Sequence, residues 1–154
     1  IADSSAWIDM LRGPASEVGR RLEQALRQGE PLLMPYVVYQ EILQGASSAR
    51  HFISLQAELD KVPSFAPDDS HETARQAAML YARCRWAGMT IRSPNDCLIA
   101  ACAIEADEPL LHADRDFEHI ATAAPLLRFV GRSERRHGLK KIKINSTSRN
   151  IYEG

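Results

Sequence analysis

The stretch Ser93–Phe117 reads Ser-Pro-Asn-Asp-Cys-Leu-Ile-Ala-Ala-Cys-Ala-Ile-Glu-Ala-Asp-Glu-Pro-Leu-Leu-His-Ala-Asp-Arg-Asp-Phe, and it decides the fold. It opens with the start signals of a helix, an N-cap serine followed by proline at the first helical position. The helix body, residues 98–106, is apolar nearly all round, which predicts burial on most sides. Pro109 breaks the helix, and the apolar run 109–112 predicts a short strand.

Two acids flank this helix and strand. Asp96 lies in the first turn of the predicted helix, and Asp114 follows directly after the predicted strand. In an open parallel α/β sheet both places lie on the same edge, at the carboxyl ends of the strands. We therefore expect the two carboxylates near one cleft.

The rest of the chain continues this alternation of short apolar strands and amphipathic helices, which implies parallel pairing through βαβ crossovers. We expect a three-layer α/β/α sandwich with a short, mainly parallel sheet of about four or five strands. The chain begins at or close to a first strand, most of which we expect before residue 1. Asp69-Ser-His-Glu72 looks like a capping box for the long helix after it. Helices are predicted over 6–11, 15–28, 36–44, 47–60, 69–87, 94–106 and 115–121, and strands over 31–34, 89–91, 110–111 and 126–130, with a loop or short strand at 61–66.

The composition fits one globular domain. The chain has 154 residues, of which 45% are apolar, and roughly 100–200 residues per domain is usual. No apolar run approaches the roughly 20 residues that span a membrane, and no signal peptide is expected, because the N-terminus carries acids in place of an apolar core. Three cysteines, Cys84, Cys97 and Cys102, cannot all pair, so we expect reduced core thiols in a cytosolic protein.

The net charge of −1 hides an uneven distribution. Residues 132–154 carry seven basic and two acidic side chains, whereas residues 1–131 carry 12 basic and 18 acidic ones. An acidic body argues against a broad nucleic-acid-binding surface, but it leaves room for a local acidic cluster that metal ions would neutralise. We assign the folded domain to residues 1–131. Residues 132–154 are expected to be a basic and polar extension, partly disordered or foreign to the domain, with an edge strand at Ile142–Ile144.

Four carboxylates stand out by position: Asp3, Glu41, Asp96 and Asp114, with Asp116 as a candidate fifth. Three of the four sit where a predicted strand gives way to a helix or in the first turn of a helix. Carboxylates gathered in one cleft repel each other strongly unless cations are present. Hard cations such as Mg²⁺ take oxygen ligands, and a two-metal site can activate water and neutralise the charge that builds on a phosphodiester.

A simpler interpretation stands beside the metal site. Aspartate is a preferred helix cap and is favourable near the positive end of the helix dipole, so capping alone would explain Asp3, Asp96 or Asp114 taken singly. Glu41 is harder to explain by solvation, because valine, isoleucine and leucine surround it on a short helix. Spacing alone leaves both interpretations open.

Other candidates carry weaker signals. His112, at a predicted strand end, either supports an acid or contacts substrate, or is an ordinary core or surface histidine. Ser4 and Ser5 lack the neighbouring histidine of a nucleophile, so capping or hydrogen-bonding support is expected. Trp7 and Trp86 are expected in the core rather than as base-stacking platforms. Four arginines could reach a backbone phosphate, although a solvated helix face explains the first two: Arg83, Arg85, Arg92 and Arg115.

Four motifs in sequence place these acids in a family context. Together they resemble the PIN-domain ribonucleases, most closely the VapC toxins of bacterial toxin–antitoxin pairs. The similarity covers about residues 1–131, and residues 132–154 match no part of the pattern. The motifs are Asp3-Ser-Ser-Ala-Trp-Ile-Asp9, Pro35-Tyr-Val-Val-Tyr-Gln-Glu41-Ile-Leu-Gln-Gly45, Asn95-Asp96-Cys-Leu-Ile-Ala-Ala101 and Leu111-His-Ala-Asp114-Arg-Asp116-Phe117.

The resemblance implies a catalytic, metal-binding quartet of Asp3, Glu41, Asp96 and Asp114, with Mg²⁺ or Mn²⁺ as cofactor. Glu41 would act directly or through a water, and Asp116 matches a position that is often acidic. One of the two serines corresponds to the hydroxyl residue that supports the first acid. We group five neighbours as supports or substrate contacts: Ser4, Ser5, Asn95, His112 and Arg115.

The function that this resemblance implies is that of a toxin in a type II toxin–antitoxin pair. Such a protein is a metal-dependent endoribonuclease that hydrolyses phosphodiesters of tRNA, rRNA or mRNA with metal-activated water. The resemblance further implies a cytoplasmic homodimer, no membrane association, and a VapB-like antitoxin whose C-terminal segment occupies the active-site groove. The alternative is a catalytically silent PIN-like module that binds RNA or a protein partner. A receiver-like or phosphatase domain also uses acids at strand ends, but Lys61 is the only lysine of residues 1–131 and lies far from a late strand.

Overall fold

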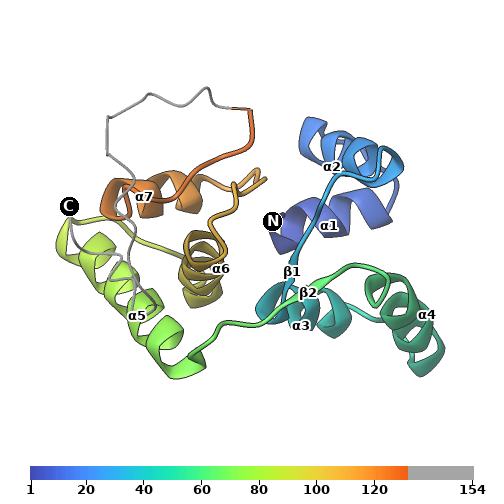
Figure 1. Cartoon of the computed structure of the whole chain (residues 1–154), viewed down its shortest axis with the longest axis horizontal. Helices are drawn as coiled ribbons and strands as arrows, with labels where there is room; N and C mark the ends of the chain where they lie inside the picture. Colours follow the sequence, from blue (N-terminus) through green and yellow to red (C-terminus); the bar gives the residue numbers. More distant parts are fainter. Residues whose placement is uncertain (132–154) are drawn as a thin grey trace.

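The computed structural model describes residues 1–131, in which helices surround short parallel strands (Figure 1). Every helix that the sequence predicts in this range is present, with ends that shift by a few residues. The proposed extension at 132–154, with its edge strand, lies outside the described residues, and the domain division stays a prediction. The elements are α1 (Ser4–Leu11), α2 (Glu17–Arg27), β1 (Met34–Pro35), α3 (Tyr36–Gln44), α4 (Ala49–Leu59), β2 (Ser64–Phe65), α5 (Ser70–Trp86), α6 (Pro94–Glu105) and α7 (Arg115–Ala123).

The two strands β1 and β2 pair in parallel, with Met34 opposite Ser64 and Pro35 opposite Phe65. The predicted strand 31–34 therefore joins a ladder only at its last residue, and the loop or strand expected at 61–66 contains β2. Proline at the end of β1 has no amide hydrogen, which limits how far this ladder extends. The strand passes directly into α3, so the helix that carries Glu41 starts at the end of β1.

A second parallel ladder passes through Leu110 and Leu111. Leu111 forms an isolated bridge with Ala2, and Leu110 forms one with Phe129. The amide of Leu111 donates to the carbonyl of Ile1 at 2.9 Å. Ile1 and Leu111 are thus neighbours. Because their two segments run in parallel, the residues that follow each segment lie at the same end of this ladder.

The described residues form an α/β fold with a small parallel sheet. The three-layer sandwich of four or five strands stays a prediction. The prediction of a strand at 89–91 is wrong, because these residues are irregular and the first of their amides caps a helix. The amide of Met89 caps α5 by donating to the carbonyl of Cys84 at 2.9 Å, and the next amide after this segment, that of Arg92, donates to the side chain of Asp116.

Helix α6 is buried on nearly every face, as its sequence predicts. It packs against α5 and α7, which Figure 1 shows beside it, and also against α3. Most of its buried side chains are small, which lets neighbouring helices approach closely. The buried positions are Cys97, Ile99, Ala100, Ala101, Cys102, Ala103 and Ile104.

The start of α6 differs in one detail from the sequence interpretation. Ser93 occupies the N-cap position, and Pro94 is the first helical residue, but the serine hydroxyl makes no capping bond. The amide of Asp96, which such a hydroxyl would bind, donates to the carbonyl of Ser93 at 3.1 Å instead. The proline ring and this backbone bond therefore start the helix without the side-chain cap.

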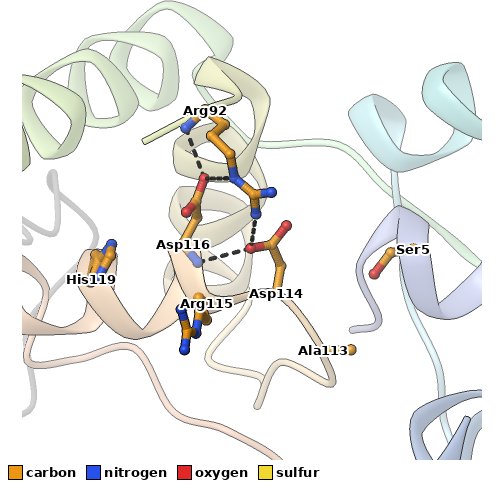
Figure 2. A pocket seen from close by; sticks show the side chains of 7 residues that line it. All are labelled: Ser5, Arg92, Ala113, Asp114, Arg115, Asp116 and His119. Atoms are coloured by element: carbon orange, nitrogen blue, oxygen red, sulfur yellow. Dashed lines mark hydrogen bonds and ion pairs between the residues drawn. The ribbon is translucent and has the colours of Figure 1, made fainter. Parts of the chain in front are cut away.

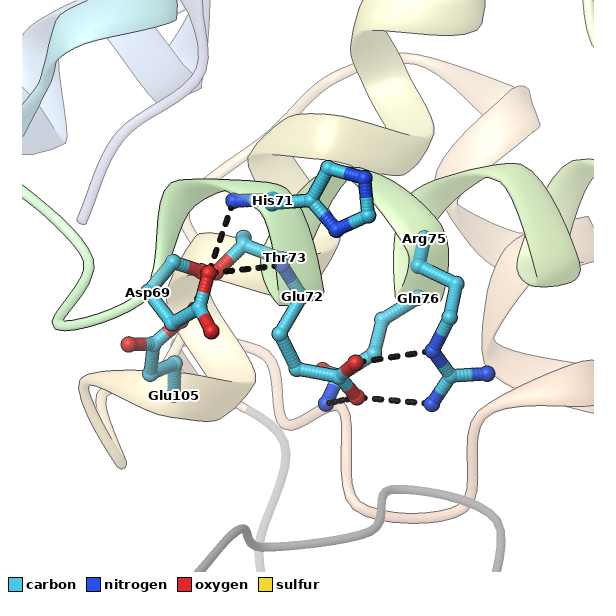
Figure 3. Close-up of polar contacts among 7 residues, drawn as sticks. All are labelled: Asp69, His71, Glu72, Thr73, Arg75, Gln76 and Glu105. Carbon is cyan, nitrogen blue, oxygen red and sulfur yellow. Dashed lines mark hydrogen bonds and ion pairs between the residues drawn. The ribbon is translucent and has the colours of Figure 1, made fainter.

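Helix α5 begins with half of the predicted capping box (Figure 3). Asp69 Oδ1 accepts from the amides of His71 and Glu72, both at 3.0 Å. The prediction of the reciprocal bond, from the side chain of Glu72 to the amide of Asp69, is wrong. The Glu72 carboxylate instead accepts from the side chains of Arg75 and Gln76 on the same helix. The hydrogen bond from Arg75 is the main reason that the pKa of Glu72 falls to about 2.

Glu105, at the end of α6, ties that helix to the start of α5. Its carboxylate accepts from the hydroxyl of Thr73 at 2.7 Å and from the amide of Asp68 at 3.0 Å. Thr73 is buried, and its hydroxyl lies within hydrogen-bond distance of both this carboxylate and the carbonyl of Asp69.

The aromatic and cysteine predictions have mixed outcomes. Trp7 is buried in the core, but the core placement of Trp86 is wrong, because this last residue of α5 is 70% exposed. The three cysteines are free and buried, as expected, and they are Cys84, Cys97 and Cys102. None of the helices in residues 1–131 is long and apolar enough to cross a membrane.

Candidate active site

Asp3 follows Ala2, which bridges to Leu111, and is the N-cap of α1. Its Oδ1 accepts from the amide of Ala6 at 3.1 Å, so it caps the helix, and its Oδ2 accepts from the hydroxyl of Ser5 at 2.6 Å. The side chain is buried, and this burial raises the pKa of Asp3 above its ordinary value against the opposing effect of both hydrogen bonds. Ser5 is therefore the hydroxyl residue that supports the first acid.

Glu41 is held by two side chains from other parts of the chain. Ser4 Oγ, on α1, donates to Oε2 at 2.6 Å, and Asn95 Nδ2, on α6, donates to Oε1 at 2.8 Å. Both carboxylate oxygens are thus oriented, and the side chain points toward α1 and α6 rather than into solvent. These bonds bring three of the four motifs together.

Asp114 and Asp116 form a hydrogen-bonded unit at the start of α7 (Figure 2). Asp114 is the N-cap, and its Oδ1 accepts from the amide of Asp116 at 3.0 Å. Arg92 bridges the two acids: its Nη2 pairs with Asp114, and its Nε lies 3.2 Å from Asp116 Oδ2. The backbone amide of Arg92 also donates to Asp116 Oδ2 at 2.8 Å.

Asp96 lies among all the other acids. Burial is the largest cause that raises its pKa to about 7, and the charges of Asp114, Asp116, Glu41 and Asp3 each raise it further. Repulsion of this kind places each of these four acids within electrostatic reach of Asp96. The structure thus gathers acids from four separate segments of the chain.

His112 supports the backbone beside this cluster. Its Nδ1 lies 2.9 Å from the carbonyl oxygen of Asp114, and its ring packs against Phe117 and Phe129 at centroid distances of 5.1 and 4.3 Å. It does not line the neighbouring pocket. These contacts place His112 against the backbone of Asp114 and two aromatic rings, and its part in the site stays a prediction.

An open pocket of about 670 Å³ lies beside Asp114 and Asp116. Figure 2 shows the side chains around it, with Arg92 above the two acids and Ser5 on the far side. Arg115 and His119 lie one turn apart on α7 and add polar groups to its wall. The lining residues are Ser5, Arg92, Ala113, Asp114, Arg115, Asp116 and His119.

The chemistry of the donors fits a hard divalent cation. All five acids offer carboxylate oxygens, which are the ligands that Mg²⁺ and Mn²⁺ prefer. The negative charges of the other four acids act on Asp96, and a cation would offset them. Within residues 1–131, however, no three His, Cys, Asp or Glu side chains are placed closely enough to hold a metal ion as they stand. Arg92 instead supplies positive charge to two of the acids.

Comparison with known proteins fits this arrangement. Residues 1–123 match the sequence profile of the family described as PIN domain. The chain belongs to the PIN-domain family. Its relatives include "VapC ribonuclease Mb1587" of Mycobacterium bovis and "Ribonuclease VapC11" of Mycobacterium tuberculosis, each 40% identical over 128 residues, which are 79% of this chain and 90% of the relative. The resemblance to VapC-type PIN domains is therefore confirmed.

The sequence of this PIN domain indicated the acids of the candidate site, but it gave no sign of the part that two pocket-lining residues, Arg92 and His119, have in it. Arg92 was assigned only to phosphate contact, because nothing local links it to acids 22 and 24 positions later. His119 gave no motif signal, although its spacing of four residues from Arg115 puts both on one helix face. Which acids bind metal, and which act in catalysis, stays a prediction.

Proposed function

We propose that this PIN domain is a VapC-type toxin that cleaves RNA endonucleolytically with the help of Mg²⁺ or Mn²⁺. The observation that carries the proposal is the convergence of the acid-bearing segments. Ser4 and Asn95 hold Glu41 between α1 and α6, and the charges of four other acids, Asp3, Glu41, Asp114 and Asp116, act on Asp96. Relatives with 40% identity that are named ribonucleases support the same activity. Together they make a nuclease the best-supported function of this chain.

Each acid has a distinct part in this proposal. Asp3, Asp96 and Asp114 would hold the metal, while Glu41 completes the cluster directly or through a water. Asp116 is a candidate fifth ligand. A bound Mg²⁺ or Mn²⁺ supplies a Lewis acid that lowers the pKa of water and offsets charge on the phosphodiester.

The remaining residues position the acids or face the substrate. Ser5 orients Asp3, and Ser4 with Asn95 fixes both oxygens of Glu41. Fixed carboxylates need no reorganisation when charge develops, which favours catalysis. Arg115 lines the pocket beside the acids, where a guanidinium suits an RNA phosphate.

The proposal extends to the biological setting. We infer an RNA substrate among tRNA, rRNA and mRNA, a VapB-like antitoxin as partner, a homodimer, and a cytoplasmic location. We also keep the α/β/α sandwich with about four or five strands as part of the proposal, because the two parallel ladders are compatible with one larger sheet.

Incubation of the purified full chain with labelled RNA tests the activity directly. Cleavage is expected with Mg²⁺ or Mn²⁺ and is expected to stop with EDTA. The Asp96→Asn variant should lose at least about 100-fold in rate, since it removes a charge from the centre of the cluster. The exposed acid Asp68, whose side chain is outside this cluster, gives the matched control Asp68→Asn.

A silent PIN-like module is the second candidate. Two observations favour it. The acids in residues 1–131 are spaced too widely to hold a metal ion as they stand, and Arg92 already forms ion pairs with Asp114 and Asp116. Binding of RNA or an antitoxin peptide without any uptake of Mn²⁺ would establish this alternative. Metal-dependent cleavage that Asp96→Asn abolishes would reject it.

A further inference from the structure

Arg92 lies in the turn between α5 and α6 and reaches across to the start of α7 (Figure 2). Its backbone amide and its Nε both donate to Asp116 Oδ2, at 2.8 and 3.2 Å. Its Nη2 donates to Asp114 Oδ1, the oxygen that also accepts from the amide of Asp116. One guanidinium thus neutralises two acids of the candidate site.

These contacts differ in how firmly they are held. Asp116 is 5% exposed in its side chain and keeps the backbone amide of Arg92 as a donor whatever the guanidinium does. Asp114 is 31% exposed and faces the open pocket, while the side chain of Arg92 is 68% exposed. Solvent weakens ion pairs between exposed partners, so the outer arm of Arg92 can leave Asp114 at little cost.

We propose that Arg92 is a displaceable internal counter-ion, which occupies Asp114 in the metal-free protein and must release it before a divalent cation binds there. The inference rests on the proposed function, in which Asp114 is a metal ligand. Arg92 and the cation compete because both are attracted by the negative charge of the same carboxylate. Arg92 is therefore a positioning residue that tunes metal affinity.

The released guanidinium would find a second partner in an RNA phosphate. Arg92 and Arg115 both line the pocket beside the acids, and an arginine binds phosphate oxygens as well as carboxylates. The side chain would move from Asp114 to an RNA phosphate in that pocket. Metal loading and substrate contact would thus be linked through one residue.

Calorimetric titration of the full chain with Mn²⁺ alone tests the competition. Arg92→Gln keeps the backbone amide but removes the charge. Arg115→Gln removes an equal charge from the same pocket and leaves the hydrogen bonds of Arg92 to the acids in place. Arg92→Gln should bind Mn²⁺ about fivefold more tightly than Arg115→Gln, which is the factor expected for a half-exposed ion pair. Arg92→Lys should lie between wild type and Arg92→Gln, because lysine keeps the charge but lacks the fork that contacts both acids.

Thermal unfolding supplies a second measurement. In EDTA, Arg92→Gln should melt at a lower temperature than Arg115→Gln, because its acids lose their counter-ion. Saturating Mn²⁺ should remove that difference, since the metal takes over the same charge. A merely structural role for Arg92 would leave the difference in place.

The outcomes separate the two proposals. If Arg92→Gln binds Mn²⁺ no more tightly than Arg115→Gln while both variants are folded by circular dichroism, the counter-ion inference is overturned and the nuclease proposal stands. If no variant and no wild-type protein takes up Mn²⁺, both are overturned. Tighter binding by Arg92→Gln together with the metal-dependent melting difference supports the inference.

Discussion

Ser4 and Glu41 are 37 positions apart, and the hydroxyl of Ser4 donates to the carboxylate of Glu41 at 2.6 Å. This bond links α1 to α3 and fixes one oxygen of an acid that sits on an otherwise apolar helix. It explains why Glu41 tolerates these surroundings, because a half-buried carboxylate with two donors is satisfied without solvent. Ser4 and Ser5, neighbours in sequence, therefore serve two different acids.

Replacement of Ser4 by alanine should lower kcat for RNA cleavage by about tenfold, because a hydrogen bond to a charged group is lost and Glu41 can rotate. The change should act on kcat more than on KM, since Ser4 does not line the pocket. Steady-state cleavage of a labelled RNA measures both constants. Ser54→Ala, at an exposed position on α4, is the control and should match wild type.

The stability of the metal-free protein should fall as pH rises from about 4 to about 7. The pKa of Asp96 is raised to about 7 in the folded state, so the folded chain holds a proton that the unfolded chain releases near pH 4. Burial raises the pKa of Asp3 and acts in the same direction. Urea unfolding in EDTA at pH 5 and pH 8 measures the change.

The variant Asp96→Asn isolates the contribution of that carboxyl group. It cannot ionise, so it should lose stability less than wild type between pH 5 and pH 8. Equal pH dependence in the two proteins would mean that Asp96 titrates normally. Asp68→Asn, which alters an exposed acid, should leave the wild-type dependence intact.

Binding of Mn²⁺ should release a proton below pH 7 and weaken as pH falls from 8 to 6. A metal ligand must be deprotonated, and Asp96 is half protonated near pH 7 in the metal-free state. Titrations in two buffers with different ionisation enthalpies count the released protons. A binding enthalpy that is the same in both buffers at pH 6.5 would contradict the prediction.

Replacement of Glu105 by alanine should destabilise the protein by about 1 kcal/mol, because the amide of Asp68 loses its acceptor and the hydroxyl of Thr73 keeps only the carbonyl of Asp69. Chemical denaturation measures the free energy of unfolding. Glu58→Ala breaks an exposed salt bridge to Lys61 and should cost well under 1 kcal/mol. A similar loss in both variants would show that the Glu105 contacts add nothing beyond a surface ion pair.

Sequence patterns predicted the helices well, because each carries its own signals. The span of α3 and the all-round burial of α6 are confirmed, since proline, glycine and apolar periodicity lie within those segments. The strands were harder, because two-residue ladders such as β1 are too short for an alternating pattern. Trp86 was misplaced, because apolar character alone does not distinguish a helix face from its exposed last turn.

The candidate site shows the same limit. Its acids could be found because each belongs to a motif of neighbouring residues. The contacts of Arg92 and Ser4 could not be found, because they join segments whose distance in space the sequence does not state. Capping and cluster membership also proved compatible, since Asp3 and Asp114 cap helices with one oxygen and adjoin Asp96.

The ladder that joins Ile1 to Leu111 has a consequence for protein synthesis. Asp3 leaves the ribosome long before Leu111, whose amide donates to the carbonyl of Ile1, and before Asp114. A growing chain therefore has no assembled acidic cluster, however much of its helical structure has formed. The proposed nuclease therefore gains its activity only after residues 111–116 have been synthesised and have paired with the earlier segment.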